Sequence, residues 1–536
     1  MPQYTNERRN VRTLCNMVGR MASALLVLGL CLSFTHAAHI LAVFSYSFPA
    51  PFLLVTPYMK ALVQNGHQVT IVSSFNHLTD IEGARHIRVQ LLDQLMHDLL
   101  NYDFISNYPL SKWAQSTIIS QFFRNSSYYI LSDPQVQGLL RDPNVHFDMI
   151  ILQASHTDAL YGLAQHFKAS LVGLSAYGTA WNIDYLAGNK APSVYEPMQP
   201  EGYSNGISLV DRFINWVYIT EEWLMDRMIF LPKQLDLYKH YFNRTAESLY
   251  EIRRNFSLML INHHFSLGRA RSNVPNVIEI AGMHMSEPIE DLEPALQRFM
   301  DEAVDGVIYF SMGLEIVDKW LPPHVLTILQ EAFEQLPWRV IWKSDLETLP
   351  NKSDRIYLSH MLAQRKLLSH SNLKLFITHG GILSIIEAAF NGVPMICLPM
   401  YYDQFGNAER MKQAGVAQVL SMATMTLEST TQIIKEVIEN PKYAKNAEQM
   451  AMRLRDQPMS PLETAVWWTE YVIRHKGAPH MRLSEQDMSF MQYYSLDIAS
   501  MLFGRIGLAI IIVTCVGIKL LRLLKKPFVL RIYHVP

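Results

Sequence analysis

Residues 373–404 constrain the fold more than any other segment, because apolar runs, glycines and a helical pattern follow one another within them. The apolar run at 373–377 is long enough for a buried parallel strand. Gly380 and Gly381 permit a sharp turn, since glycine accepts backbone angles that other residues avoid. Apolar side chains at helical spacing follow, and Gly392 stands where a helix would end. The segment therefore predicts a strand, a glycine turn, a helix and a second strand.

The start of this predicted helix is suited to an anion, because its first N–H groups lack backbone partners and carry the positive end of the helix dipole. His379 lies beside this point and can donate to a phosphate. Asp403 and Gln404 follow the next strand, so they are expected at the same carboxyl edge of the sheet, where open α/β sheets bind ligands. The pattern predicts a nucleotide diphosphate at the helix and a polyhydroxylated group at Asp403 and Gln404.

The 536-residue chain is too long for one compact core, which favours two domains. Both halves open with strand, helix and strand: 39–44, 55–65 and 68–73 in the first half, and 306–311, 322–335 and 339–343 in the second. We therefore predict an α/β protein with two doubly wound, Rossmann-like domains facing a cleft. Residues 286–294, with their acids and prolines, are the predicted linker, and residues 460–474 are a predicted late helix.

Charge and cysteine content exclude some classes of protein. The net charge of −2 gives no reason to expect a nucleic acid partner. Of the four cysteines, Cys397 alone falls in the body of the chain, so no disulfide is expected there. The pair His263 and His264 lacks a second ligand group at metal spacing, so no metal site is predicted.

The two ends of the chain predict its compartment. Arginines precede an apolar run at 21–34, and small residues follow, so residues 1–38 read as a cleavable secretory signal, with Met21 as an alternative start. Residues 498–521 are apolar enough to span a membrane, and the basic tail at 522–536 is expected in the cytosol. The body would then be lumenal or extracellular. Four sequons become candidate glycosylation sites there: Asn125, Asn243, Asn255 and Asn351.

Residues 210–242 are rich in tryptophan, tyrosine, phenylalanine and methionine. Trp216, Trp223 and Met228 could face a core, an acceptor pocket or the membrane. A core position is the commonest outcome for such side chains, and it is our expectation here.

The glycine-containing segment resembles the UDP-glycosyltransferases, specifically the membrane-bound animal branch with UDP-glucuronosyltransferase-like members, of insect type. Further similarity lies in 42–73, 147–188, 306–313 and 460–468 and in the C-terminal anchor, so nearly the whole chain is covered. The matching positions of the segment are His379, Gly380, Gly381, Ser384, Glu387, Pro394, Pro399, Asp403, Gln404 and Asn407.

The resemblance implies a GT-B type fold and inverting transfer of glucose or glucuronate from a UDP-sugar to a small lipophilic acceptor. The UDP-sugar would be a co-substrate, with no cofactor. A single-pass type I protein of the endoplasmic reticulum membrane is implied, and an oligomer with itself or with relatives is left open. The expected segments after the signal are acceptor-binding 39–285, UDP-sugar-binding 286–480, juxtamembrane 481–497, transmembrane 498–521 and cytosolic 522–536.

The resemblance also implies roles for individual donor-site residues. His379 and the backbone after it would bind the diphosphate, Glu387 the ribose, and Asp403 and Gln404 the sugar. Met361 stands where the family has a tryptophan over the uracil. The full expected UDP-sugar site is Ser311, Gly313, Met361, Gln364, His379, Gly380, Gly381, Ser384, Glu387, Asp403, Gln404 and Asn407.

The catalytic positions depart from the family pattern. Pro51 occupies the place of the family's histidine base, and Gln153 occupies the place of its carboxylate partner. His156 and Asp158 are weak substitutes, and Asp158 could instead cap the helix that is predicted to start at Ala159. Leu314 also replaces a serine, which removes a hydroxyl donor to phosphate.

Two hypotheses therefore stand. The first is an active transferase that relies on orientation and leaving-group stabilisation or on a relocated base. The second is a catalytically impaired member that binds a ligand or regulates a partner in the membrane. A glycoside hydrolase is disfavoured, because the chain invests in a nucleotide site rather than in two carboxylates that flank a glycosidic bond.

Overall fold

The computed structural model describes residues 37–45, 49–74, 81–100, 111–189, 208–268, 270–314, 316, 320–346, 348–350, 352–400, 403–483, 490–493 and 495–524. The predicted signal at 1–38 lies outside these residues except for its last two positions, and Asn351 and the tail from residue 525 onward also lie outside them. The chain divides into two units, residues 1–481 and 482–536.

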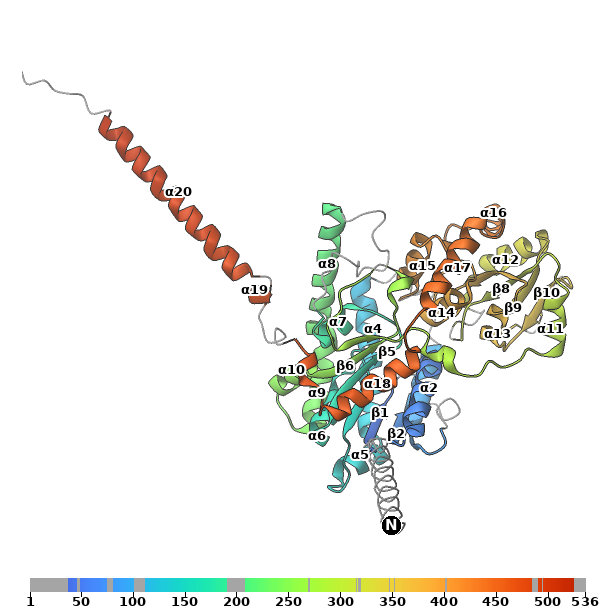
Figure 1. The fold of residues 1–536 in the computed structure, drawn as a ribbon, viewed down its shortest axis with the longest axis horizontal. Helices are drawn as coiled ribbons and strands as arrows, with labels where there is room; N and C mark the ends of the chain where they lie inside the picture. Colours follow the sequence, from blue (N-terminus) through green and yellow to red (C-terminus); the bar gives the residue numbers. More distant parts are fainter. Residues whose placement is uncertain are drawn as a thin grey trace, which may run out of the picture. The chain divides into compact units, whose positions relative to one another are not determined.

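The first sheet of the larger unit has seven parallel strands in the order β3-β2-β1-β4-β5-β6-β7 (Figure 1). Strand order reverses direction between β1 and β4, as in doubly wound folds. The strands are β1 His39–Val43, β2 Gln68–Ser73, β3 Arg85–Arg88, β4 Met149–Gln153, β5 Ser170–Ser175, β6 Phe256–Ile261 and β7 Val277–Glu279.

Helices cover both faces of this sheet, because its side chains alternate between two buried cores. Leu41 and Val43 of β1 pack into one core, which includes residues of α4 and α9. Ile40 and Ala42 pack into the other, with residues of α2 and α18. The helices are α2 Ala50–Gln64, α3 Gln90–Leu100, α4 Lys112–Ser132, α5 Pro134–Arg141, η1 Asp158–Tyr161, α6 Gly162–Phe167, α7 Trp181–Ala187, α8 Leu209–Met225, η2 Asp226–Phe230, α9 Leu231–Phe242 and α10 Ala246–Arg253.

The second sheet has six parallel strands in the order β10-β9-β8-β11-β12-β13, with its own reversal between β8 and β11. The strands are β8 Val307–Ser311, β9 Arg339–Lys343, β10 Ile356–Ser359, β11 Leu373–Thr378, β12 Met395–Cys397 and β13 Ala417–Val419. Its two faces are again buried in separate cores, which contain Val307 and Ile308 of β8 respectively. The predicted pair of doubly wound sheets is confirmed.

Helices of the second half follow the expected sequence signals. Gly392 adopts φ +68 and ends α14, where the sequence predicted a stop. Ser460 and Glu463 form a capping box that starts α18. The elements are η3 Phe265–Leu267, η4 Met283–Ser286, α11 Pro294–Asp301, α12 Pro323–Gln335, α13 Gln364–Leu368, α14 Ile382–Asn391, α15 Gln404–Gln413, α16 Leu427–Glu439, α17 Pro441–Arg455, α18 Pro461–Arg474 and η6 Pro479–Met481.

Although α18 follows the second sheet in the chain, it packs on the first (Figure 1). It contacts α2, β5 and β6, and its Ala465 and Val472 belong to a core of the first sheet. The Tyr58 hydroxyl of α2 also bonds Thr469 of α18. The end of the larger unit is therefore part of the first sheet's structure.

The apolar segment around α8 differs from expectation. Trp216, Trp223 and Met228 are 59%, 43% and 66% exposed, so our prediction that they lie in the core is wrong. The α8 helix buries Asn215 and Met225 instead, and it presents much of its apolar side outward. Helical periodicity identified an apolar face, but it could not say which surface, if any, covers that face.

The smaller unit contains α19 Phe490–Tyr493 and the 29-residue α20 Leu496–Leu524, which has no buried residues. Within the described part of the chain, α20 is the one helix whose length and composition would let it cross a membrane. It contains the predicted span at 498–521.

Candidate functional site

Most of the predicted donor-site residues gather where the strand order of the second sheet reverses. Ser311 ends β8 and His379 follows β11, and these two strands are neighbours. Asp403 follows β12, the next strand in the sheet. Because all strands are parallel, their carboxyl ends meet at one edge, which is where such sheets hold ligands.

The imidazole of His379 is held between two glycines. A Cβ atom on Gly313 would lie 2.6 Å from its Cε1, and a Cβ on Gly381 would overlap its Nε2. Gly313 also has φ +87, a conformation that side chains resist. These glycines are therefore required by the close approach of two loops to the ring, in addition to any approach of a ligand.

His379 is neutral at physiological pH. Desolvation, reinforced by the charge of Lys343, lowers its pKa to about 4. Lys343 itself donates to the carbonyl of Gly313 at 2.7 Å, which fixes the loop after β8. A neutral imidazole keeps one N–H for donation to a phosphate oxygen, while Lys343 contributes positive charge to the same region.

Asp403 and Asn407 tie the loop after β12 to the glycine turn. The Asn407 side-chain amide donates to the Asp403 carboxylate at 2.7 Å and to the carbonyl of Gly380 at 3.1 Å. The backbone N–H of Ile382, in the first turn of α14, also donates to Asp403. Burial raises the pKa of Asp403 to about 6 although Asn407 opposes the shift. A carboxylate thus lies beside the start of α14.

Gln364, Ser384 and Glu387 form a second cluster of the predicted residues. The Gln364 amide donates to Glu387 Oε2 at 2.8 Å and to the Ser384 hydroxyl at 3.2 Å, and its oxygen accepts from Tyr309 at 3.1 Å. Ser384 and Glu387 are buried on α14. Gln364 starts α13, so this helix and α14 are joined through their polar side chains.

The remaining donor-site residues are less closely joined. The side-chain oxygen of Gln404 accepts from the backbone N–H of Met400 at 2.8 Å, which stabilises its own loop. Met361 is 68% exposed in the loop after β10, and Leu314 is 41% exposed after β8. Both of these apolar side chains are accessible, although they replace residues that the family uses at the nucleotide.

A family model described as UDP-glucoronosyl and UDP-glucosyl transferase matches residues 52–528. The chain belongs to this family. UDP-glycosyltransferase UGT5 of Dactylopius coccus is 30% identical over 494 residues, which cover 91% of this chain and 93% of that protein. UDP-glucuronosyltransferase 2A3 of Cavia porcellus is 28% identical over 534 residues, which cover 92% and 96%.

Solved glycosyltransferase structures share the fold. The glycosyltransferase of kitacinnamycin superposes with a TM-score of 0.56 at 16% identity, over 81% of this chain and 98% of that one. Arabidopsis thaliana UGT89C1, solved with UDP-L-rhamnose, gives a TM-score of 0.52 at 14% identity, over 82% and 99%. At identities this low, the similarity shows only a shared architecture, which is the two-sheet GT-B arrangement.

The expected catalytic positions of the UDP-glycosyltransferase family lie at the reversal point of the first sheet. Ser45, after β1, donates to the side-chain oxygen of Gln153, at the end of β4, at 2.7 Å, and both side chains are buried. Pro51 is buried in the first turn of α2. Neither Pro51 nor Gln153 can take a proton from an acceptor, so a neutral hydrogen bond stands at the positions where the family resemblance predicts a base and its carboxylate.

The carboxylate that pairs with His156 belongs to Asp226. The His156 ring stacks on Phe230 with centroids 3.9 Å apart, and its Nδ1 lies 3.7 Å from Asp226 Oδ1. Asp158 faces Arg253 Nε at 2.7 Å. Thr157 holds the cap position of the short helix η1, so the alternative that Asp158 caps a helix from Ala159 is wrong. The Asp158 carboxylate is buried and pairs with Arg253 instead.

Sequence reasoning missed Asp226 and Arg253, which complete this buried cluster. Arg253 donates to both oxygens of Asp226, at 2.8 and 3.0 Å. Burial alone would raise the pKa of Asp226, but Arg253 and His156 lower it to about 2. Burial raises the pKa of Asp158 despite Arg253. No motif links residues so far apart in the chain, so no local signal could have found the cluster.

The predicted modification sites have different surroundings. Asn243 and Asn255 are exposed. Asn125 lies within α4, and the hydroxyl of its sequon residue Ser127 is buried and donates to Gln234 at 2.9 Å.

His263 pairs with Glu279 at 3.2 Å, and the described residues contain no group of three potential metal ligands.

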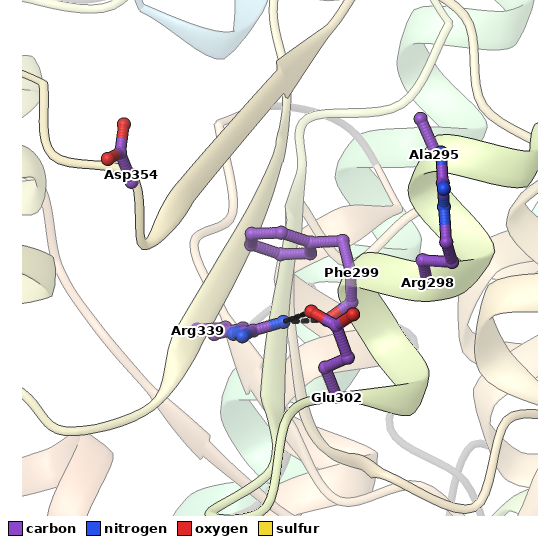
Figure 2. Close-up of a pocket in the computed structure, with 6 residues that line it drawn as sticks. All are labelled: Ala295, Arg298, Phe299, Glu302, Arg339 and Asp354. Carbon is purple, nitrogen blue, oxygen red and sulfur yellow. Dashed lines mark hydrogen bonds and ion pairs between the residues drawn. The ribbon is translucent and has the colours of Figure 1, made fainter.

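One hollow lies away from these residues. A depression of about 300 Å³ is found beside α11 and the first residue of β9, at the amino end of that strand (Figure 2). There Arg339 donates to the carbonyl of Phe299 at 2.6 Å and lies 3.7 Å from Glu302. Its lining residues are Ala295, Arg298, Phe299, Glu302, Arg339 and Asp354. No predicted donor-site residue is among them, and it lies at the opposite end of the strands from the candidate site.

Proposed function

We propose that this protein is an inverting transferase that moves glucose or glucuronate from a UDP-sugar to a small lipophilic acceptor. The observation that carries the proposal is the junction of three loops at one edge of the second sheet. Asn407 joins Asp403 to Gly380, while His379 sits between Gly313 and Gly381. This junction supports a site for a diphosphate and an adjoining sugar.

Each part of the donor has residues suited to it. The neutral His379, the backbone at Gly380 and Gly381, and the loop of Ser311 and Gly313 would hold the diphosphate. Glu387, braced by Gln364, would accept from the ribose hydroxyls. Asp403 and Gln404 would orient the sugar, and Met361 would cover the uracil. Ser384 and Asn407 support these groups through hydrogen bonds.

In the proposed reaction, the acceptor oxygen attacks the anomeric carbon from the side opposite the leaving group. The bond from that carbon to the diphosphate oxygen breaks, UDP leaves with the electron pair, and the acceptor's proton passes to water. The helix start at Gly381, together with His379 and Lys343, would stabilise the charge that develops on the diphosphate. Fixing the sugar hydroxyls would supply orientation.

The acceptor's proton lacks the family's usual base, because Pro51 and Ser45–Gln153 occupy that place. Loss of base catalysis typically costs about 10² to 10⁴ in rate. Acceptors that are already acidic, such as phenols, suffer least, and they are the class we propose. His156, next to Asp226, is the remaining weak candidate for a relocated base.

Family membership over nearly the whole chain and an intact donor-site network favour an active transferase. A ligand-binding or regulatory role, which the loss of the usual base first suggested, is not favoured by them.

The proposal includes a single-pass protein of the endoplasmic reticulum membrane, with the body in the lumen and the tail in the cytosol. The apolar α20 supports an anchor, and the basic residues Lys519 and Arg522 at its end support the orientation. Cleavage after residue 38 and glycans at the exposed Asn243 and Asn255 belong to the same proposal. Digestion with a glycosidase before and after membrane permeabilisation would test it.

The direct test is calorimetric titration of the full chain in detergent with UDP and with UDP-glucose. We expect both to bind, and we expect His379→Ala to weaken each at least about tenfold by removing a donor to the diphosphate. His67→Ala serves as the control, because His67 is a buried histidine of the first sheet's side, just before β2, with Glu470 at 3.5 Å. Absence of UDP binding by the folded, unaltered protein would contradict the proposed function.

A further inference from the structure

The segment between the two sheets places a histidine against the donor site. The short helix η4 follows β7 after Gly282, whose φ of +88 turns the chain sharply. Ile280 and Met283 are buried in the core that also holds α2 and α18, and η4 contacts both helices. His284 in η4 is therefore anchored to the first sheet's side of the molecule.

The side chain of His284 reaches an acid of the second sheet's side. Its Nε2 lies 3.3 Å from Glu387 Oε1, and the two side chains are 2% and 6% exposed. The other oxygen of Glu387 accepts from Gln364 at 2.8 Å. Both ring nitrogens of His284 lack a hydrogen bond of good geometry within the described part of the chain. The carboxylate of Glu387 therefore lies within ion-pair distance of this imidazole.

A second contact holds the same segment from the second sheet's side. Arg365, next to Gln364 in α13, donates to the carbonyls of Met285 and Glu287 at 2.7 and 2.8 Å. The two helices that carry Gln364 and Glu387 therefore both contact the segment of η4 through side chains. The contacts form a strap, which we define as residues 283–287, across the nucleoside end of the proposed donor site.

We propose that His284 is a positioning residue for the donor, which holds Glu387 so that its carboxylate can accept from the ribose hydroxyls. This inference rests on the proposed function of Glu387. A buried carboxylate is stable only when hydrogen-bonded or paired, and its orientation follows its partners. With the His284 ring 3.3 Å from one oxygen and Gln364 donating to the other, the orientation of the Glu387 carboxylate is restricted while lone pairs remain for a ligand.

The contact also links the two sheets. Glu387 lies on α14, in the second sheet's half, and His284 lies on η4, whose Met283 is buried in a core of the first. A movement that separates η4 from α14 would release the carboxylate that holds the nucleoside. Binding of the ribose would then favour the conformation in which the strap is in contact, so donor binding and the arrangement of the two halves are coupled.

The test compares UDP with 2′,3′-dideoxy-UDP, which keeps the uracil and the diphosphate but lacks both ribose hydroxyls. For His284→Ala in the full chain, we expect UDP to bind about tenfold more weakly and the dideoxy compound to bind unchanged. His284→Gln, which retains a donor, should recover most of the affinity. The combined change of His284→Ala with Glu387→Ala should weaken UDP binding no more than Glu387→Ala alone.

A general structural role would reduce the affinity for both nucleotides, and melting temperatures of each variant would reveal it; equal losses would overturn the proposal. His67→Ala is again the control, and it should leave both affinities unchanged. Normal UDP binding by His284→Ala would overturn this inference while the proposed function stands. Failure of the unaltered, folded protein to bind UDP would overturn the proposed function itself.

Discussion

The two sheets of this protein share one topology, yet the points at which their strand order reverses carry different chemistry. In the second sheet, the loops there bring together a neutral histidine, a partly buried carboxylate and the start of a helix. In the first sheet, the equivalent loops supply the hydrogen bond between Ser45 and Gln153, with Pro51 nearby in α2. The fold therefore provides two equivalent places, and loop residues decide what each can do.

The difference has a consequence for catalysis. In the proposed function, the second sheet's half holds the diphosphate and the sugar, and these tasks depend on backbone shape as much as on side chains. In the first sheet's half, the positions at which the family resemblance places the base and its carboxylate carry no titratable group, since they are Pro51 and Gln153. Charges do exist on that side, but Arg253, Asp158 and Asp226 pair with one another in the interior. The function we propose is therefore that of a protein that binds its donor well and activates its acceptor poorly.

The largest expected effect comes from introducing a histidine and a carboxylate at the two positions where the resemblance predicts them. We expect the combined change of Ala50→Ser, Pro51→His and Gln153→Asp to raise kcat by about 10² to 10⁴ for a weakly acidic alcohol acceptor. A phenol should gain much less, because it needs less help in losing its proton. Steady-state rates with both acceptor types, at saturating UDP-sugar, measure the effect.

The control is the variant with Ala50→Ser and Pro51→His but with Gln153 unchanged. Its imidazole has no carboxylate partner, so it should recover a smaller part of the rate. If the unaltered protein already transfers to alcohols rapidly and the combined variant is no faster, the base lies elsewhere. A loss of activity in His156→Gln would then identify it.

The buried charges of the first sheet's half are expected to serve stability rather than catalysis. We expect Arg253→Ala to lower the free energy of unfolding by about 3–5 kcal/mol, because it leaves Asp158 and Asp226 buried without their cation. Urea unfolding of the full chain in detergent measures this. Arg254→Ala, at the neighbouring position at the end of α10, is the control and should cost far less.

A different outcome would change the role of the cluster. If Arg253→Ala kept its stability and lost transferase activity instead, the charges near His156 would serve catalysis, and the contrast between the two halves would fail.

Much of this organisation was predictable, because local patterns determine it. The strand at 339–343 and the helix end at Gly392 match the structure residue for residue. The donor-site residues also meet at one sheet edge, since parallel strands bring their carboxyl ends together.

Contacts between distant segments were not predictable. Asp226 with Arg253, and His284 with Glu387, join residues that no periodicity relates. The exposure of Trp216 also escaped prediction, because a sequence pattern shows an apolar face without showing what covers it.

The smallest expected effect concerns the stability that the second sheet's half loses by holding the Asp403 carboxylate away from water. Burial raises the pKa of Asp403 to about 6, so the native state binds more protons than the unfolded chain between about pH 4 and 6. Asp403 therefore costs no stability below this window, and it destabilises the fold progressively as pH rises through it. We expect Asp403→Asn to stabilise the protein by about 1–2 kcal/mol at pH 7.5 and by almost nothing at pH 4.

Melting temperatures at the two pH values measure this, and Asp291→Asn, at a 90% exposed carboxylate, is the control. The same Asp403→Asn change should weaken UDP-glucose binding while leaving UDP binding intact, because the charged acceptor of the sugar hydroxyls is lost. If the variant were instead less stable at both pH values, the hydrogen bonds from Asn407 and Ile382 would outweigh desolvation. The donor site would then be a stabilising feature of the second sheet, and the two halves would differ in chemistry without differing in its cost to stability.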